Sequence, residues 1–338
     1  MHASHDLPAC RTPIVDWRDA GHRYYAFSLY LRTVFGHRVQ KVSIDAGFTC
    51  PNVDGSVAIG GCTFCDNRSF SPSRRIPRRD IRDQIDEGIR GLRRRYKCDH
   101  FIAYFQPATN TYAPVEQLEP LFRQALDHED VVGLSIGTRP DCVEEDVLDL
   151  LEQLNSETFL SVEYGMQTMH DQSLDWMNRG HHHQVTRDAV RRSRERGLSI
   201  CLHLMLGLPG ESHQQMMETA REVAALQVDA VKIHNLYAVK NTDLATQVER
   251  GEVQLMELDE YARTVTEFIE WLPPGMVVER ISGDAPPDYF LGPAWCQDKS
   301  RVLAAIDEQF QQRDTWQGKK WIETDASKLD NGPPVTTK

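Results

Sequence analysis

The chain has 338 residues and a formal net charge of −12. It contains no stretch near the roughly 20 apolar residues that a membrane span needs, and its first residues lack the regions of a signal peptide. We therefore expect a cytoplasmic protein with no membrane segment, whose eight cysteines bind metal or pack rather than form disulfides.

Strand-like and helix-like runs alternate along the chain after residue 40. The strand candidates are short and apolar on both faces, as buried parallel strands are: Val42–Ala46, Phe101–Gln106, Val131–Gly137, Phe159–Tyr164, Leu198–Leu206, Ala230–Tyr237 and Val277–Ile281. Amphipathic runs between them predict helices near 115–126, 143–154 and 261–272. Repeated β-α units predict a parallel sheet, either an open partial barrel or a doubly wound sheet, with ligands at the carboxyl ends of the strands.

These patterns divide the chain into four segments. Residues 1–40 are expected to form an N-terminal extension with a helix around Tyr24–Val34, and residues 41–285 form the α/β unit. Residues 286–323 are a C-terminal helical extension, with a helix over 297–313. The polar, proline-containing tail 324–338 is expected to be disordered.

Three cysteines follow the first predicted strand in a glycine-rich loop. Cys50, Cys62 and Cys65 have the spacing C-x11-C-x2-C. Thiolates favour zinc or an iron–sulfur cluster, and a structural zinc site usually needs four ligands. A four-iron cluster normally takes four thiolates, so three leave one iron open to an exogenous ligand. On spacing alone, a cluster, a zinc loop and packed cysteines all remain open.

Polar motifs follow the next five strand candidates: YFQPATNTYAP, SIGTRPDCV, VEYGMQTMHDQSLDWMNRGHH, HLMLGLPGES and KIHNLYAVKNT. With the cysteine motif, this ordered set resembles the radical S-adenosylmethionine (radical SAM) superfamily. Within it, the chain resembles the YhcC/YtqA-type proteins, which are similar to the radical SAM domain of the Elongator catalytic subunit. The resemblance runs from Tyr24 to Gly318 and implies a partial (β/α)6 TIM-like barrel with an N-terminal extension and a C-terminal helix.

The resemblance implies an enzyme that cleaves SAM reductively at a [4Fe-4S] cluster to make a 5′-deoxyadenosyl radical. Cys50, Cys62 and Cys65 are then the cluster ligands, and SAM binds the fourth iron. The implied SAM contacts are Phe64 and Gly207 near the adenine, Gln167 and His203 at the ribose, and Arg179 at the carboxylate. The glycine-rich motif ending in glutamate that holds the SAM amino group is not evident here. Gln106 and Asn110 stand in its place. Some relatives also carry a glutamate just before the Thr-Arg-Pro-Asp motif, where this chain has Gly137. Glu163 is either a candidate to compensate for that glutamate or a structural residue at the end of a strand.

The residues that act on the substrate are not identified by the resemblance. Polar candidates follow the sixth strand, and each can equally be a solvated strand-end residue: Lys232, His234, Asn235, Tyr237 and Lys240. The run His181–His183 either binds metal or begins a helix. The remaining cysteines show no second cluster motif: Cys10, Cys98, Cys142, Cys201 and Cys296.

The resemblance also implies a substrate, because YtqA-like proteins are linked to the C5 side chain of the wobble uridine in tRNA. They are linked to converting a carboxymethylaminomethyl group towards an aminomethyl one. In this acidic chain the segment Arg68–Lys97 carries eleven Lys/Arg against four Asp/Glu, which can contact phosphates or form the solvated face of a helix. The alternatives are a radical SAM enzyme for a small metabolite or a protein side chain, or a non-catalytic iron–sulfur or zinc module. A reductase such as flavodoxin or ferredoxin is the expected electron donor.

Overall fold

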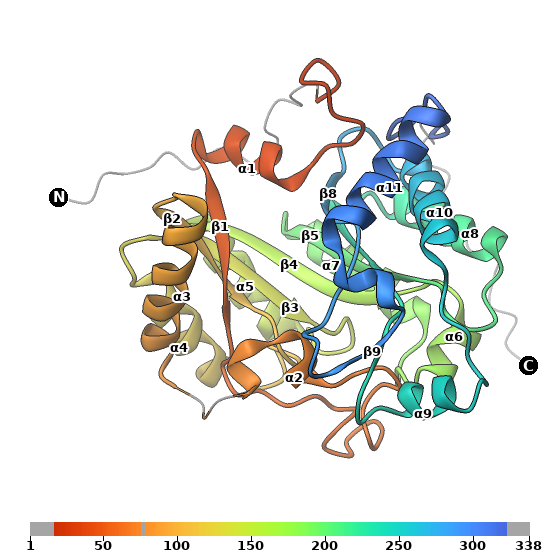
Figure 1. Cartoon of the computed structure of the whole chain (residues 1–338). Coiled ribbons are helices and arrows are strands. Elements are labelled where there is room, and N and C mark those ends of the chain that lie inside the picture. The colour runs from red at the N-terminus through yellow and green to blue at the C-terminus, as the bar shows by residue number, and fades with distance from the viewer. Residues whose placement is uncertain (1–16, 76, 78, 323–338) are drawn as a thin grey trace, which may run out of the picture.

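The computed structural model describes residues 17–75, 77 and 79–322. Seven parallel strands form one sheet in the order β1-β2-β3-β4-β5-β6-β8: β1 (Val39–Ile44), β2 (His100–Phe105), β3 (Val131–Thr138), β4 (Phe159–Gln167), β5 (Ser199–Leu206), β6 (Ala230–Asn235) and β8 (Val277–Arg280). The order never reverses along the chain, so the doubly wound alternative is wrong. The sheet curls into a half-barrel (Figure 1), which confirms the predicted partial barrel.

Helices flank the curled sheet on its outer face and at its two ends. They are α1 (Phe27–Phe35), α2 (Asn67–Phe70), η1 (Pro72–Arg75), α3 (Ile81–Tyr96), α4 (Val115–Leu126), α5 (Glu145–Glu157), α6 (Asp171–Trp176), α7 (His183–Glu195), α8 (His213–Leu226), α9 (Asp243–Glu249), α10 (Leu258–Trp271), η2 (Ala294–Gln297) and α11 (Lys299–Gln312). A small antiparallel pair joins β7 (Ala238–Val239) to β9 (Phe290–Gly292). Figure 1 shows α2, α9 and β9 gathered at the end of the sheet where the strands finish. No helix in the described part of the chain is long and apolar enough to cross a membrane. The predicted tail 324–338 and Cys10 lie outside the described residues.

Helix α3 illustrates how the sequence fixes a helix against the sheet. The Asp80 side chain accepts a hydrogen bond from the Arg82 backbone N–H and caps the first turn. The buried face consists of Ile81, Ile85 and Ile89, at helical spacing. A Cβ on Gly88 would lie 2.3 Å from Cγ2 of Val42, so glycine allows α3 to approach β1 closely. Oε1 of Gln84, in the first turn of α3, accepts a hydrogen bond from the Asp45 backbone N–H at 2.9 Å, so this turn lies near the carboxyl end of β1.

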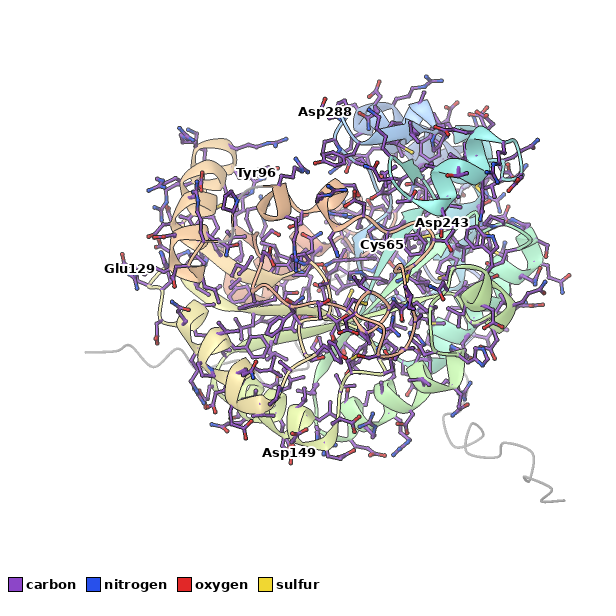
Figure 2. All side chains as sticks on the ribbon, turned by 90° about the horizontal axis from the view of Figure 1, so that it is seen from below. Cys65, Tyr96, Glu129, Asp149, Asp243 and Asp288 are labelled. Carbon is purple, nitrogen blue, oxygen red and sulfur yellow. The ribbon has the colours of Figure 1, made fainter. Side chains whose placement is uncertain are left out.

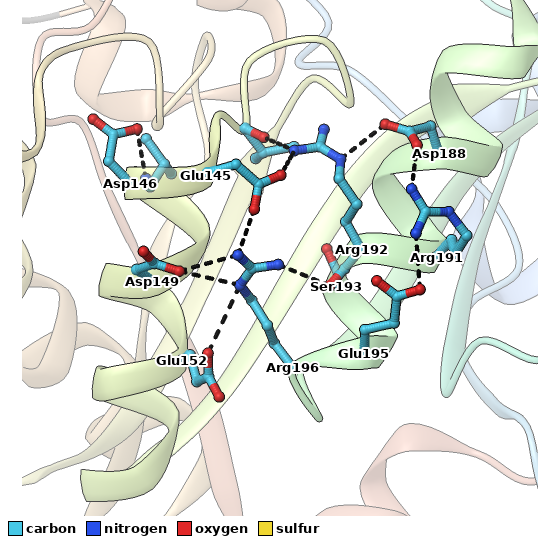
Figure 3. A network of polar contacts seen from close by, with 12 residues as sticks. Glu145, Asp146, Asp149, Glu152, Asp188, Arg191, Arg192, Ser193, Glu195 and Arg196 are labelled. Atoms are coloured by element: carbon cyan, nitrogen blue, oxygen red, sulfur yellow. Dashed lines mark hydrogen bonds and ion pairs between the residues drawn. The ribbon is translucent and has the colours of Figure 1, made fainter.

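Ion pairs connect the neighbouring helices α5 and α7 on the outer surface (Figure 3). Arg196 lies within 3.0 Å of Asp149 and also pairs with Glu145. Arg192 lies 3.0 Å from Glu145 and 2.8 Å from Asp188. Because the carboxylates are exposed, each pair contributes at most about 1 kcal/mol. The network therefore aligns two helices rather than supplying most of their stability.

The two edge strands of the half-barrel meet through side chains. Nζ of Lys41, on β1, lies 2.7 Å from Oε2 of Glu279, on β8. The amino end of the barrel is closed by residues from both ends of the described chain. Nε1 of Trp17 donates to the Pro274 carbonyl at 2.9 Å, and the buried Gln317 side chain accepts from the Tyr25 backbone N–H at 2.8 Å. The open end is therefore the carboxyl end of the strands.

Candidate functional site

The carboxyl ends of the strands surround a cavity of about 250 Å³. Figure 2 looks onto this end of the barrel and shows Cys65 near its centre. Most residues predicted for the site line this cavity: Cys50, Cys62, Phe64, Cys65, Gln106, Glu163, Gln167, Arg179, His203, Lys232, His234, Asn235 and Tyr237. The curl of the sheet thus brings together residues that are up to 187 positions apart, from Cys50 to Tyr237.

Three predicted site residues do not line the cavity. The Asn110 side chain donates to the carbonyls of Phe105 at 3.1 Å and Gly137 at 2.8 Å, which ties the loop after β2 to β3. Lys240 is exposed, because the chain leaves the barrel after β6 to pair β7 with β9. Gly207 begins the turn after β5 with a φ of 85°, a conformation that favours glycine. None of the three therefore contributes to the cavity lining.

The three cysteines come from a single loop that is fastened to the far side of the cavity. The amide nitrogen of Asn52 donates to the Arg179 carbonyl at 2.9 Å and lies 3.5 Å from Sγ of Cys62. Burial, with Cys62 and Cys50 beside it, raises the pKa of the Cys65 thiol. All three cysteines line the same cavity.

The arrangement of the thiols bears on the choice between a zinc ion and a cluster. Zinc needs its ligand atoms about 2.0–2.3 Å from a single ion. Within residues 17–75, 77 and 79–322, no group of three His, Cys, Asp or Glu residues is placed to hold one metal ion. In a cluster each thiolate binds a different iron, so the sulfurs stand farther apart. Three cysteines in one cavity match the three irons of a cluster that keeps one iron open to another ligand.

Arg179 lies between Cys62 and the Gly-x-Gln motif of β4. Its Nη1 is 3.7 Å from Sγ of Cys62, and its Nη2 donates to the Gly165 carbonyl at 2.6 Å. A Cβ on Gly165 would lie 2.5 Å from Nη2 of Arg179 and 2.9 Å from Nε2 of Gln167, so a larger residue there would displace the ends of these two side chains. Nε of Arg179 is buried without a partner among the described residues. The guanidinium therefore retains a donor for a ligand.

Two further arginines, Arg139 and Arg280, line the cavity, and the sequence analysis predicted no role for either of them. Arg139, in the Thr-Arg-Pro-Asp motif, pairs with Asp141 at 2.6 Å, and its Nη1 lies 4.0 Å from Sγ of Cys50. Burial lowers the pKa of Arg139, but the hydrogen-bonded Asp141 raises it further, so the charge beside Cys50 is fixed. Arg280 is the last residue of β8. Its position at the end of a strand was the only signal in the sequence.

An ion-pair network forms the floor of the cavity. Nζ of Lys41 lies 2.7 Å from both Glu163 and Glu279, and Lys232 pairs with the same two carboxylates. Nε2 of His203 lies 2.7 Å from Oε2 of Glu163. Burial alone would raise the pKa of Glu163, but Lys232 and Lys41 hold it well below its ordinary value. Glu163 and Lys232 thus neutralise each other, and neither presents a free charge to a cofactor or a substrate.

The histidine run and the remaining cysteines do not form a second site in the described part of the chain. His182 is exposed and lies 2.9 Å from Asp175, whereas His183 is buried and lies 2.9 Å from Glu222. Burial, the largest cause, lowers the pKa of His181 to about 3. The other described cysteines are free and buried: Cys98, Cys142, Cys201 and Cys296. The run therefore begins α7 and does not converge on a metal.

The basic segment Arg68–Lys97 divides between the two ends of the barrel. Arg74 lies 3.0 Å from Asp45, which follows β1 at the cavity end. Arg93 lies 2.9 Å from Asp130, which precedes β3 at the opposite end. The 16 residues of α3 separate these ends by about 24 Å. Only the part of the segment up to the first turn of α3 lies on the cavity side.

Comparisons with known proteins agree with this geometry. The Radical SAM superfamily model matches residues 59–223, and the radical SAM C-terminal domain model matches residues 228–312. The uncharacterized protein YtqA of Bacillus subtilis is 42% identical over 297 residues, covering 88% of this chain and 92% of that one. Protein YhcC of Escherichia coli is 36% identical over 274 residues, covering 81% and 87%.

More distant likenesses have lower sequence identity. A tRNA uridine(34) acetyltransferase of Methanocaldococcus jannaschii is 29% identical over 158 residues, covering 46% of this chain and 29% of that one. The structure of Methanocaldococcus infernus Elp3 superposes with a TM-score of 0.63 at 20% identity, covering 82% of this chain and 64% of that one. At this identity the superposition shows the shared fold.

The family implies a [4Fe-4S] cluster and SAM, and the cavity residues fit both groups. Three thiols are available for three irons, with Asn52 and Arg179 as donors beside Cys62. The unpartnered Nε of Arg179 and the space kept open by Gly165 suit an anionic part of SAM. The chain is a radical SAM enzyme, a member of the radical SAM superfamily in the group that contains YtqA and YhcC.

Proposed function

We propose that this enzyme remodels the C5 side chain of the wobble uridine in tRNA. The observation that carries the proposal is the likeness, over 158 residues, to proteins named tRNA uridine(34) acetyltransferase. That likeness is joined by one to Elongator complex protein 3 of Drosophila melanogaster, at 23% identity over 192 residues. We further propose that the enzyme works in the cytoplasm with a flavodoxin or ferredoxin as electron donor.

Bound in this cavity, a [4Fe-4S] cluster and SAM would supply the radical chemistry that removes a hydrogen atom from the substrate. The contribution of the chain is to hold these groups and to position the substrate. Arg139 and Arg179 place two positive charges beside the sulfurs of Cys50 and Cys62. Such donors stabilise thiolates and raise the reduction potential of a cluster.

The surface beside the cavity supports an RNA substrate. Arg68 and Arg75 precede α3 on the cavity side, and both residues are exposed. Arg75 also packs 5.5 Å from the ring centre of Tyr289, which joins this surface to the segment near β9. Contacts from arginine to phosphates provide most non-specific affinity for nucleic acid. We propose that tRNA lies across this side, whereas Arg93 to Lys97, at the other end of the barrel, do not contact it.

The test is formation of 5′-deoxyadenosine by anaerobically reconstituted protein supplied with SAM and dithionite. Reactions contain bulk tRNA from cells that lack this enzyme, tRNA from cells that have it, or no tRNA. We expect only the tRNA from cells that lack the enzyme to raise the rate of 5′-deoxyadenosine formation. Nucleoside mass spectrometry of that tRNA should find a changed uridine.

Each other result points to a different function. If neither tRNA sample changes the rate of 5′-deoxyadenosine formation, the protein is still a radical SAM enzyme. A small metabolite or a protein side chain would then be favoured as its substrate. No deoxyadenosine from fully loaded protein, alongside an active control enzyme, would favour a non-catalytic iron–sulfur module.

A further inference from the structure

Three polar side chains that are not used by the ion-pair network line one side of the cavity. Arg280 ends β8, His234 lies on β6, and Tyr237 follows β6; all three line the cavity. No hydrogen bond or ion pair links the side chain of Arg280 or Tyr237 to another described residue, and Nε2 of His234 is buried without a partner. Arg280 is exposed and Tyr237 is half-buried, so Nε2 of His234 is the one buried polar atom on this side of the cavity that lacks a partner within the described chain. Buried polar atoms normally have a hydrogen-bond partner, and a ligand in the cavity can supply it.

Gly283, in the loop after β8, packs closely against His234 and Tyr237. A Cβ on Gly283 would lie 3.0 Å from Nδ1 of His234 and 3.1 Å from Cε1 of Tyr237. The backbone N–H of Gly283 donates to Oδ1 of Asn235 at 2.8 Å, which holds the loop against β6. The glycine thus lets the loop seat the imidazole and the phenol side by side.

The carboxylates nearby do not neutralise Arg280. Glu163 and Glu279 both form ion pairs with Lys41 and Lys232 at the floor of the cavity. Asp284 is exposed and forms no ion pair with Arg280. Of the four cationic side chains that line the cavity, Arg139, Arg179 and Lys232 have polar partners within the described chain, and Arg280 has none. Its charge is therefore available to a ligand.

His234 and Tyr237 are hydrogen-bond donors of neutral charge at physiological pH. Burial, followed by the charge of Arg280, lowers the pKa of His234 well below its ordinary value, so the imidazole is uncharged. Burial raises the pKa of Tyr237 to about 12, so the phenol keeps its proton. One cation flanked by two neutral donors matches a single negative charge spread over several oxygens.

We infer that Arg280, His234 and Tyr237 form a subsite that binds an oxyanion of the substrate. The inference rests on the proposed function, because it concerns the same cavity and the same RNA. In RNA the oxyanion is either a carboxylate on the base substituent or a backbone phosphate. Arginine suits both, since its planar fork binds two oxygens at once.

The test is the binding of three synthetic anticodon stem-loops to reconstituted protein with SAM and no reductant, so that no cleavage occurs. The wobble uridine carries a carboxylate-bearing C5 substituent, an amine-bearing one, or none. We expect Arg280→Gln to weaken binding of the oxyanion-bearing RNA by about 10- to 100-fold, as a lost charged hydrogen bond does. Arg280→Lys should recover part of this loss, and His234→Phe should show a smaller loss. A loss confined to the carboxylate stem-loop assigns a carboxylate, and an equal loss on all three assigns a phosphate.

The matched control is Arg94→Gln, which removes the same charge from the exposed end of α3, at the opposite end of the barrel. It should leave all three affinities unchanged. The inference is overturned if Arg280→Gln binds every stem-loop as the unaltered protein does, or if only SAM binding weakens. If tRNA from deficient cells still raises deoxyadenosine formation, the proposed function survives that result. If no stem-loop binds the unaltered protein and no tRNA raises the rate, the proposed function itself fails and the subsite fails with it.

Discussion

Replacing Glu163 by glutamine removes one negative charge from the ion-pair network under the cavity. Lys41 and Lys232, whose side chains are 14% and 8% exposed, are then left with Glu279 as their only carboxylate. Leaving a buried charge without its partner costs about 3–5 kcal/mol. With a urea m value of about 3 kcal/mol/M, the unfolding midpoint should fall by about 1–1.7 M.

The measurement is urea unfolding of anaerobically reconstituted protein, followed by circular dichroism. As a control, Glu87→Gln breaks a surface pair whose carboxylate is 54% exposed, and should cost at most about 1 kcal/mol. The double variant Glu163→Gln with Lys232→Met leaves one buried lysine facing one buried glutamate, so it should recover more than half of the loss. The reasoning is refuted if Glu163→Gln costs no more than Glu87→Gln, or if the double variant is less stable than the single one.

Further predictions concern the cofactors and pH. Gly165→Ala should displace the Arg179 guanidinium and weaken SAM binding about 10- to 100-fold in equilibrium dialysis. Gly91→Ala, with open space around its Cβ, should leave SAM binding unchanged. Equal effects of the two substitutions would contradict the predicted contact between Arg179 and SAM. Cys50→Ala should lower the iron content and the visible absorbance of the cluster, and Cys142→Ala, at a buried thiol outside the motif, should keep both; loss in both variants would contradict the ligand assignment. The pKa of Glu163 is held low in the folded state, so ionised Glu163 stabilises the fold at any pH above the pKa of an unfolded glutamate, about 4.3. This contribution to the free energy of unfolding is lost as the pH falls from that value through the pKa of Glu163 in the folded protein. The difference in the free energy of unfolding between the unaltered protein and Glu163→Gln should therefore become smaller below about pH 4. A difference that does not change with pH would contradict the predicted direction of the pKa shift.

The sequence by itself determined the sheet and the position of the site along the chain. Short runs that are apolar on both faces, such as Phe159–Tyr164, identified each parallel strand, because a strand covered by helices must be buried on both sides. The strands follow one another in the sheet in chain order, so local patterns were sufficient for the topology. Polar residues directly after each strand then located the cavity, since parallel strands end at a common edge.

Only the tertiary structure decided which of those polar residues are available to ligands. Lys232 and Glu163 both follow the expected pattern, yet the curl of the sheet brings them against each other and against Lys41 and Glu279. Arg280 was not among the predicted site residues, and it matters because no carboxylate pairs with it in the described chain. Whether a charge is paired depends on contacts between distant parts of the chain. Those contacts arise only when the curled sheet brings its first and last strands together.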